Sequence, residues 1–186
     1  HSVKLWENLS EELNFNMMFS QRGVMNLAHN EHDIKEMKRR ISANRLNGLD
    51  TKWLDTKQIK ELVPIMNTEN LRYPVLGAAF QPRGGVARHD AVAWGYALRS
   101  NEMGVDIIQN CEVKDIKTDN HKVEGVNTSK GFIKANKVAV VASGHTSVLA
   151  QTAGVRLPLQ SRPLQALVSE PIKPVIDTVV MSNAVH

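Results

Sequence analysis

The amino-acid sequence predicts an α+β fold, and three features support this. Apolar residues recur at helical spacing from the start of the chain, in residues 2–13. Three short runs separated by polar tips, at 111–117, 122–128 and 132–138, are typical of an antiparallel β-meander. The continuous apolar run 138–142 is typical of a strand that is buried on both faces of a parallel sheet.

Short extended segments and helices alternate in the first part of the chain. After the first helix, we expect the segments 17–20 and 23–28 to pair as a hairpin through a turn at 21–23. Asn30 is a good cap for a second helix, and Gly48 is a good residue to end it. We expect a short strand at 53–54, then a third helix capped by Asp55 or Thr56 and ended by Pro64.

The second part begins with a segment of small and turn-forming residues, 76–90, and we expect a helix from about Asp90 to Gly104. A strand at 105–109 should lead into the meander. Gly144 then breaks the apolar run, and a helix restarts over 145–154. Further extended runs are expected in the tail, at 164–169 and 178–182. The sequence lacks the G-x-G-x-x-G turn of a dinucleotide-binding fold, so we interpret it as an internal part of a longer protein.

Composition excludes several classes of function. Of the 186 residues, 42% are hydrophobic and 23% charged, which is typical of a soluble globular domain. No apolar run approaches the roughly 18 residues of a membrane span, and no secretion signal is visible. The net charge is +4, but the basic residues are scattered, so we expect no nucleic-acid partner. Cys111 is the only cysteine, which favours a cytoplasmic location; a small residue buried in a strand is a better interpretation of it than a reactive thiol.

The segment PRGGVARHDAVAWGYA is the first candidate site. Gly84 and Gly85 allow either a close backbone approach or a positive φ. Arg88 and His89 precede the expected helix, whose first turn attracts anions. Local physics alone favours a simpler arrangement, in which Asp90 caps the helix and His89 is a surface residue, because Gly-Gly turns before helices are common.

The second candidate is the passage VAVVASGHTSVLA, in which His145 follows Gly144 at the expected carboxyl end of the sheet. Capping of the next helix by Thr146 or Ser147 is the favoured interpretation there. His29 and His32 have a spacing that can bind metal, but a third ligand is missing nearby. We therefore interpret them as surface histidines and expect no metal site.

Four strings carry a family resemblance: LWENLSEELNFNMMFSQRGVMNLAH, GGVARHDAVAWGYA, GVDIIQNCEV and VVASGHTSVLA. In this order, with the meander between them, they resemble the D-amino-acid-oxidase-like flavoproteins, and in particular the beta subunits of heterotetrameric sarcosine oxidases. The resemblance extends over essentially all 186 residues. It implies that residues 1–186 are the central part of one FAD-dependent oxidoreductase domain. Segments 1–70 and 158–186 would belong to an antiparallel substrate-domain sheet, and 71–157 to the flavin-binding part.

Particular residues acquire roles through this resemblance. It implies that His89 carries FMN covalently through the 8α-methyl carbon of the flavin, and that Arg88 contacts the same FMN. Val113 would contact a noncovalent FAD through its backbone. The Gly-rich turn that grips FAD and the catalytic residues are expected outside this segment.

The implied reaction is the oxidation of sarcosine to glycine, with reduction of oxygen to hydrogen peroxide. The implied partners are alpha, gamma and delta subunits, the alpha subunit binding tetrahydrofolate, which takes up the one-carbon unit, and NAD. Two alternatives remain: a single-chain glycine, dimethylglycine or proline oxidase or dehydrogenase of the same superfamily, and a non-catalytic scaffold subunit.

Overall fold

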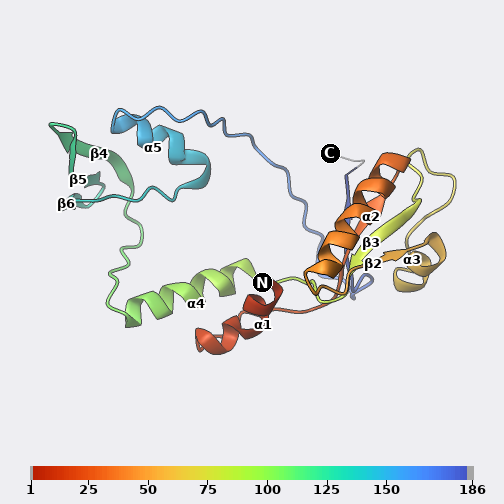
Figure 1. Ribbon diagram of the computed structural model, residues 1–186. Coiled ribbons are helices and arrows are strands. Elements are labelled where there is room, and N and C mark those ends of the chain that lie inside the picture. Colours follow the sequence, from red (N-terminus) through yellow and green to blue (C-terminus); the bar gives the residue numbers. More distant parts are fainter. Residues whose placement is uncertain (1, 184–186) are drawn as a thin grey trace. The chain divides into compact units, whose positions relative to one another are not determined.

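A computed structural model describes residues 2–183, which form two compact units (Figure 1). The first unit comprises the chain up to Val105 together with the segment from Pro171. The second unit comprises residues 106–170. None of the helices in the described residues is long and apolar enough to cross a membrane.

A four-stranded sheet organises the first unit, with strand order β2-β3-β1-β7. The central pair, β1 (Val24–Ala28) and β3 (Gly77–Gln81), is antiparallel. The short strand β2 (Lys52–Leu54) pairs antiparallel with β3, and β7 (Val179–Ser182) pairs parallel with β1. The sheet therefore joins segments that are far apart in the sequence.

Helices cover both faces of this sheet. Helix α2 (Glu31–Leu46) places Met37 and Ile41 in a cluster with Ala28 and Ala79. Helix α3 (Thr56–Leu62) packs on a larger cluster. That cluster consists of Met25, Leu27, Leu54, Ile59, Val63, Val75, Ala78 and Phe80. The two clusters hold alternate residues of β1 and β3, so they lie on opposite faces of the sheet.

A separate apolar cluster joins the first helix to the helix that begins at His89. Helix α1 (Ser2–Glu12) contributes Leu9, which packs with Leu13 and Met17. Val92 of helix α4 (His89–Glu102) packs against the same cluster. A Cβ atom at Gly95 would lie 2.5 Å from the Met17 Cε atom, so α4 approaches this cluster closely.

The second unit is an antiparallel meander covered by a helix. Its strands are β4 (Val113–Asp119), β5 (Lys122–Thr128) and β6 (Gly131–Lys134), in that order. A 3₁₀ helix (Ser143–His145) leads into α5 (Thr146–Thr152). The backbone N–H of Ile116 in β4 donates to the Thr152 hydroxyl at 3.0 Å, which fixes α5 against the meander.

The α+β class is confirmed, as are the helices and the meander. Asn30 accepts a hydrogen bond from the backbone N–H of Asp33 at 2.9 Å, and Gly48 follows the end of that helix with a φ of 76°. Asp55 caps α3 in a reciprocal arrangement with Gln58, as its sequence position predicts. Of the expected tail strands, only the second is present, as β7.

Three strand predictions are wrong. Residues 17–20 do not pair with 23–28: Ser20 bridges Val86 instead, and β1 pairs with β3 and β7. Residues 105–109 and 138–142 are not strands. An isolated apolar run cannot form a strand without neighbours for its N–H and C=O groups, and none of the strands in the described residues pairs with 138–142.

Two smaller expectations also change. The turn-rich segment 76–90 contains the central strand β3, which the sequence did not predict. Cys111 is half-buried rather than buried, and it precedes β4 instead of lying in it.

Candidate functional site

The turn before α4 is held by close backbone contacts. The N–H of Gly84 donates to the Gln81 carbonyl at 3.2 Å and closes the turn after β3. Ser20 and Val86 then exchange two backbone hydrogen bonds, of 2.8 and 3.0 Å. A Cβ atom at Gly85 would lie only 2.0 Å from the Ser20 carbonyl oxygen. Of the two roles that the sequence allows for this glycine pair, the structure shows close approach, because neither residue has a positive φ.

Arg88 and His89 lie at the start of α4, and both are exposed. Arg88 occupies the N-cap position, but its guanidinium pairs with the Asp90 carboxylate through two contacts, of 3.1 and 2.5 Å. These hydrogen bonds from Arg88 hold the pKa of Asp90 below its ordinary value of 3.8. Of the simpler arrangement considered from the sequence, one part is confirmed, because His89 is a surface residue. The other part is wrong, because Arg88 and not Asp90 occupies the N-cap position.

A groove of about 500 Å³ lies beside this helix start. Because Ser20 and Val86 are paired extended residues, alternate residues of the two segments point to the same side. The third wall is the segment that enters β7, where the Thr178 hydroxyl donates to the Arg22 carbonyl at 3.1 Å. The groove is lined by Met18, Ser20, Arg22, Val86, Arg88, Ile176, Asp177, Thr178 and Val179.

An ion-pair network on the other side of the turn joins it to α1. The Glu7 carboxylate accepts two hydrogen bonds from Arg83 Nη2, of 2.8 and 2.9 Å, and a third from Arg83 Nε at 3.2 Å. Gln21 Nε2 donates to Glu7 at 2.8 Å and to the Arg83 carbonyl at 2.9 Å. Three separate segments are thereby fixed next to the glycine pair. No local sequence pattern indicated this network.

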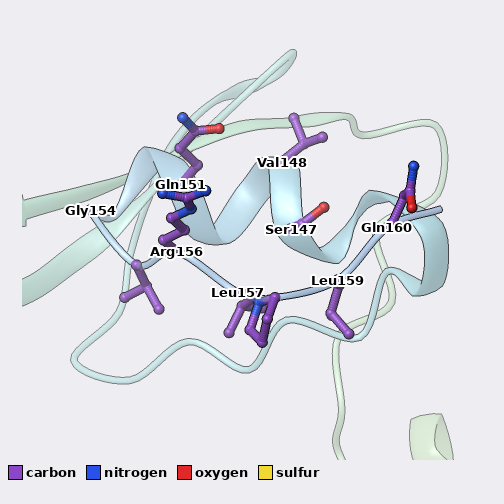
Figure 2. A pocket seen from close by; sticks show the side chains of 10 residues that line it. Ser147, Val148, Gln151, Gly154, Arg156, Leu157, Leu159 and Gln160 are labelled. Atoms are coloured by element: carbon purple, nitrogen blue, oxygen red, sulfur yellow. The ribbon is translucent and has the colours of Figure 1, made fainter.

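The second candidate passage lies in the other compact unit. His145 is exposed and is itself the N-cap of α5, so the prediction that Thr146 or Ser147 caps this helix is wrong. The reason is that the 3₁₀ helix continues directly into α5. Figure 2 shows Ser147, with other side chains of α5, beside the chain that follows the helix, around an open pocket of about 840 Å³. Val113 begins β4 and pairs with Thr128; its contact with FAD stays a prediction.

His29 has a structural role. Its Nδ1 atom lies 3.1 Å from the Pro74 carbonyl, and its Nε2 atom lies 2.8 Å from the Ser182 hydroxyl. Because a carbonyl only accepts, Nδ1 is the donor to Pro74. Within residues 2–183, no cluster of three or more histidine, cysteine or acidic side chains could hold a metal ion.

The chain belongs to the FAD dependent oxidoreductase family, whose model matches residues 1–184. The family resemblance seen in the sequence is thereby confirmed. Among solved structures, the L-proline dehydrogenase from P. horikoshii matches with a TM-score of 0.80 and 28% identity, over 98% of this chain and 48% of that one. The glycine oxidase from Geobacillus kaustophilus has the same fold, with a TM-score of 0.74 at 21% identity, over 98% of this chain and 49% of that one.

Two curated proteins of the same name are more similar to this chain in sequence than these structures are. The sarcosine oxidase subunit beta of Arthrobacter sp is 58% identical over 186 residues, which is all of this chain and 46% of that protein. The subunit of the same name from Rhodobacter capsulatus is 54% identical over 182 residues, or 98% of this chain and 44% of that protein. The chain thus spans less than half the length of these curated relatives.

Proposed function

We propose that this chain is part of the beta subunit of a multi-subunit sarcosine oxidase. The observation that carries the proposal is its identity to two such subunits, 58% and 54%, over nearly all of its residues. The whole enzyme would oxidise sarcosine to glycine, reduce oxygen to hydrogen peroxide and pass the one-carbon unit to tetrahydrofolate. Its partners would be alpha, gamma and delta subunits, with tetrahydrofolate and NAD bound by alpha.

The alternative of a single-chain amino-acid oxidase or dehydrogenase has weaker support, because the proline dehydrogenase is 28% identical. A non-catalytic scaffold role has weaker support than catalysis, because the relatives with 58% and 54% identity are oxidase subunits. We retain the cytoplasm as the location on the basis of the single cysteine. We also retain the division into substrate-domain segments, 1–70 and 158–186, and a flavin-binding segment, 71–157.

In this proposal, His89 holds FMN by a covalent bond from its imidazole to the 8α-methyl carbon of the flavin. When bound, FMN would accept electrons from FAD and deliver them to oxygen. His89 suits attachment because it is exposed, so its imidazole is open to a ligand. The neighbouring groove of about 500 Å³ is within the range of roughly 300–1,000 Å³ that is usual for cofactor sites.

Arg88 and Val113 would hold the two flavins without a covalent bond. Arg88 brings a positive charge to the helix start, where an anionic group is also favoured by the unpaired N–H groups of the first turn. Val113 would contact FAD through its backbone at the start of β4. Residues that act on the substrate would lie outside this segment.

The test of this proposal is the substitution His89→Ala in the full-length protein, produced with its partner subunits. We expect the acid-precipitated polypeptide to lose its flavin fluorescence, while extractable FAD remains at the wild-type level. His32→Ala is the matched control, because His32 is also an exposed histidine in the first turn of a helix. Protein-linked flavin that persists in His89→Ala would remove His89 from this role. Arg88→Ala should reduce FMN incorporation but not FAD content.

A further inference from the structure

The groove beside α4 contains a second arginine, Arg22, which no sequence motif indicated. Its Nε atom donates to the Ser20 hydroxyl at 2.9 Å, which directs the side chain along the groove. Arg22 comes from the segment before β1, and Arg88 from the segment before α4. The Ser20–Val86 pair fixes these two segments side by side, so two guanidinium groups line one groove.

The two arginines differ in how firmly their charges are paired. Arg88 makes two contacts with Asp90, of 3.1 and 2.5 Å. Arg22 makes a single contact of 3.4 Å with Asp177, whose side chain is 85% exposed. Single ion pairs at such exposure contribute little to stability. Arg22 can therefore exchange Asp177 for another anion at small cost.

The charge of a phosphate monoester requires more than one cation. Such a group carries about −1.5 to −2 charges at neutral pH. The charge of Arg88 is already balanced by Asp90, so Arg88 alone leaves most of that charge uncompensated. Arg22 brings a second positive charge to the same groove, and its single contact with Asp177 leaves this charge more available than that of Arg88. Its planar fork also suits phosphate oxygens.

We propose that Arg22 binds the phosphate of the flavin attached at His89, as a second anion-binding residue beside Arg88. This inference rests on the proposed function, since it assumes that the ligand is FMN. It assigns a role to the segment before β1, which the family resemblance did not.

The test compares FMN with riboflavin, which lacks the phosphate. The full-length protein and its partner subunits are produced in a host starved of riboflavin, loaded with FAD, and titrated with each flavin. Covalent flavin is then measured on the acid-precipitated polypeptide. For Arg22→Ala, we expect the FMN concentration at half-maximal attachment to rise about tenfold or more, as for a lost hydrogen bond to a charged group. Riboflavin attachment should not change.

Two further variants and a control make the result specific. Arg22→Lys should recover part of the FMN preference, because it keeps the charge but not the fork. Arg22→Gln should behave like Arg22→Ala while retaining a donor for Ser20, which guards against a folding defect. Arg99→Ala is the control, because Arg99 is an exposed, ion-paired arginine at the other end of α4.

Three outcomes would overturn the inference. Unchanged half-saturation by FMN in both Arg22→Ala and Arg22→Gln would exclude a phosphate contact. An equal loss of FMN and riboflavin attachment, or a parallel loss of FAD, would assign Arg22 a structural role instead. If wild-type protein attaches no flavin at all, the proposed function itself fails; if it attaches FMN at His89 and only the Arg22 result is negative, the proposed function stands.

Discussion

Gly85→Ala should damage the turn before α4 more than any other single-methyl addition in that turn. The new Cβ atom would lie 2.0 Å from the Ser20 carbonyl oxygen and 2.8 Å from the Gln21 Cα atom. Both are backbone atoms, so the clash cannot be relieved by a side-chain rotation. The chain must separate Ser20 from Val86, whose two hydrogen bonds of 2.8 and 3.0 Å would be lost or lengthened.

The expected cost follows from these contacts. Overpacking by one methyl group typically costs about 1–3 kcal/mol. Each backbone hydrogen bond contributes roughly 0.5–1.5 kcal/mol net, and two are at risk. We therefore expect Gly85→Ala to destabilise the full-length protein by about 2–6 kcal/mol. Covalent flavin should fall as well, because His89 follows this turn by four residues.

Thermal unfolding and acid-precipitable flavin measure these two effects on the same samples. Gly84→Ala should have a smaller effect, because its Cβ atom would meet the Val24 Cγ2 atom at 2.7 Å, and a side chain can move. Gly144→Ala is the control, because its nearest neighbour, the Ser161 hydroxyl, would be 3.4 Å away. If Gly85→Ala has the same Tm as Gly144→Ala and keeps its covalent flavin, the close approach of Gly85 to the Ser20 carbonyl does not determine the structure of this site.

Three other changes test the scaffold around the site. Hydrogen bonds from Arg83 hold the pKa of Glu7 below its ordinary value of 4.5, so this stabilisation is present above that pH and is lost as the pH falls through the lowered pKa. Glu7→Gln should therefore flatten the fall of Tm between about pH 6 and about pH 3, and a wild-type slope would contradict this. Ile59→Ala, at a fully buried position, should cost about 2–5 kcal/mol in denaturant unfolding, whereas Leu62→Ala on the same helix, 43% exposed, should cost much less. Asn30→Ala should cost about 0.5–2 kcal/mol by the same assay, and no loss would mean that its cap is not needed.

Local signals in the sequence predicted what depends on neighbours in the chain. The caps at Asn30 and Asp55 need only the next three residues, and both helices begin where those caps indicate. The meander follows the same logic, because its strands pair with the next strand along the chain. These features required no knowledge of the tertiary structure.

Long-range pairing was not predictable in this way. β3 escaped prediction because its sequence, GAAFQ, is rich in small residues rather than in the β-branched residues that mark strands. The structure supplies a reason: a Cβ atom at Gly77 would lie 2.1 Å from the Trp53 ring, and Ala78 and Ala79 are buried on opposite faces under two helices. The small residues reflect crowding by distant segments.

The residues of the candidate site also differ in whether local sequence or long-range pairing brings them together. Gly85, Arg88 and His89 lie within five consecutive residues, so their proximity could be predicted without knowledge of the fold. The sequence placed Arg22 in a hairpin turn. It did not place Arg22 near Arg88, because the two are brought together by the pairing of Ser20 with Val86, and no local pattern predicts a pairing between residues so far apart in the chain. Residues that reach a site through a distant strand pairing become visible only in three dimensions.

The pairing of Arg88 with Asp90 also changes the meaning of the helix start. Asp90 in the first turn already satisfies the preference of this end of α4 for negative charge, and it accepts a hydrogen bond from the Ala91 N–H at 2.8 Å. An incoming phosphate therefore meets a carboxylate at the helix start as well as an arginine. Attraction must come from the less firmly paired cation, and Arg22, which makes one contact of 3.4 Å with Asp177, is that cation in this groove. Arg88 would then orient the ligand, while Arg22 supplies the more available charge.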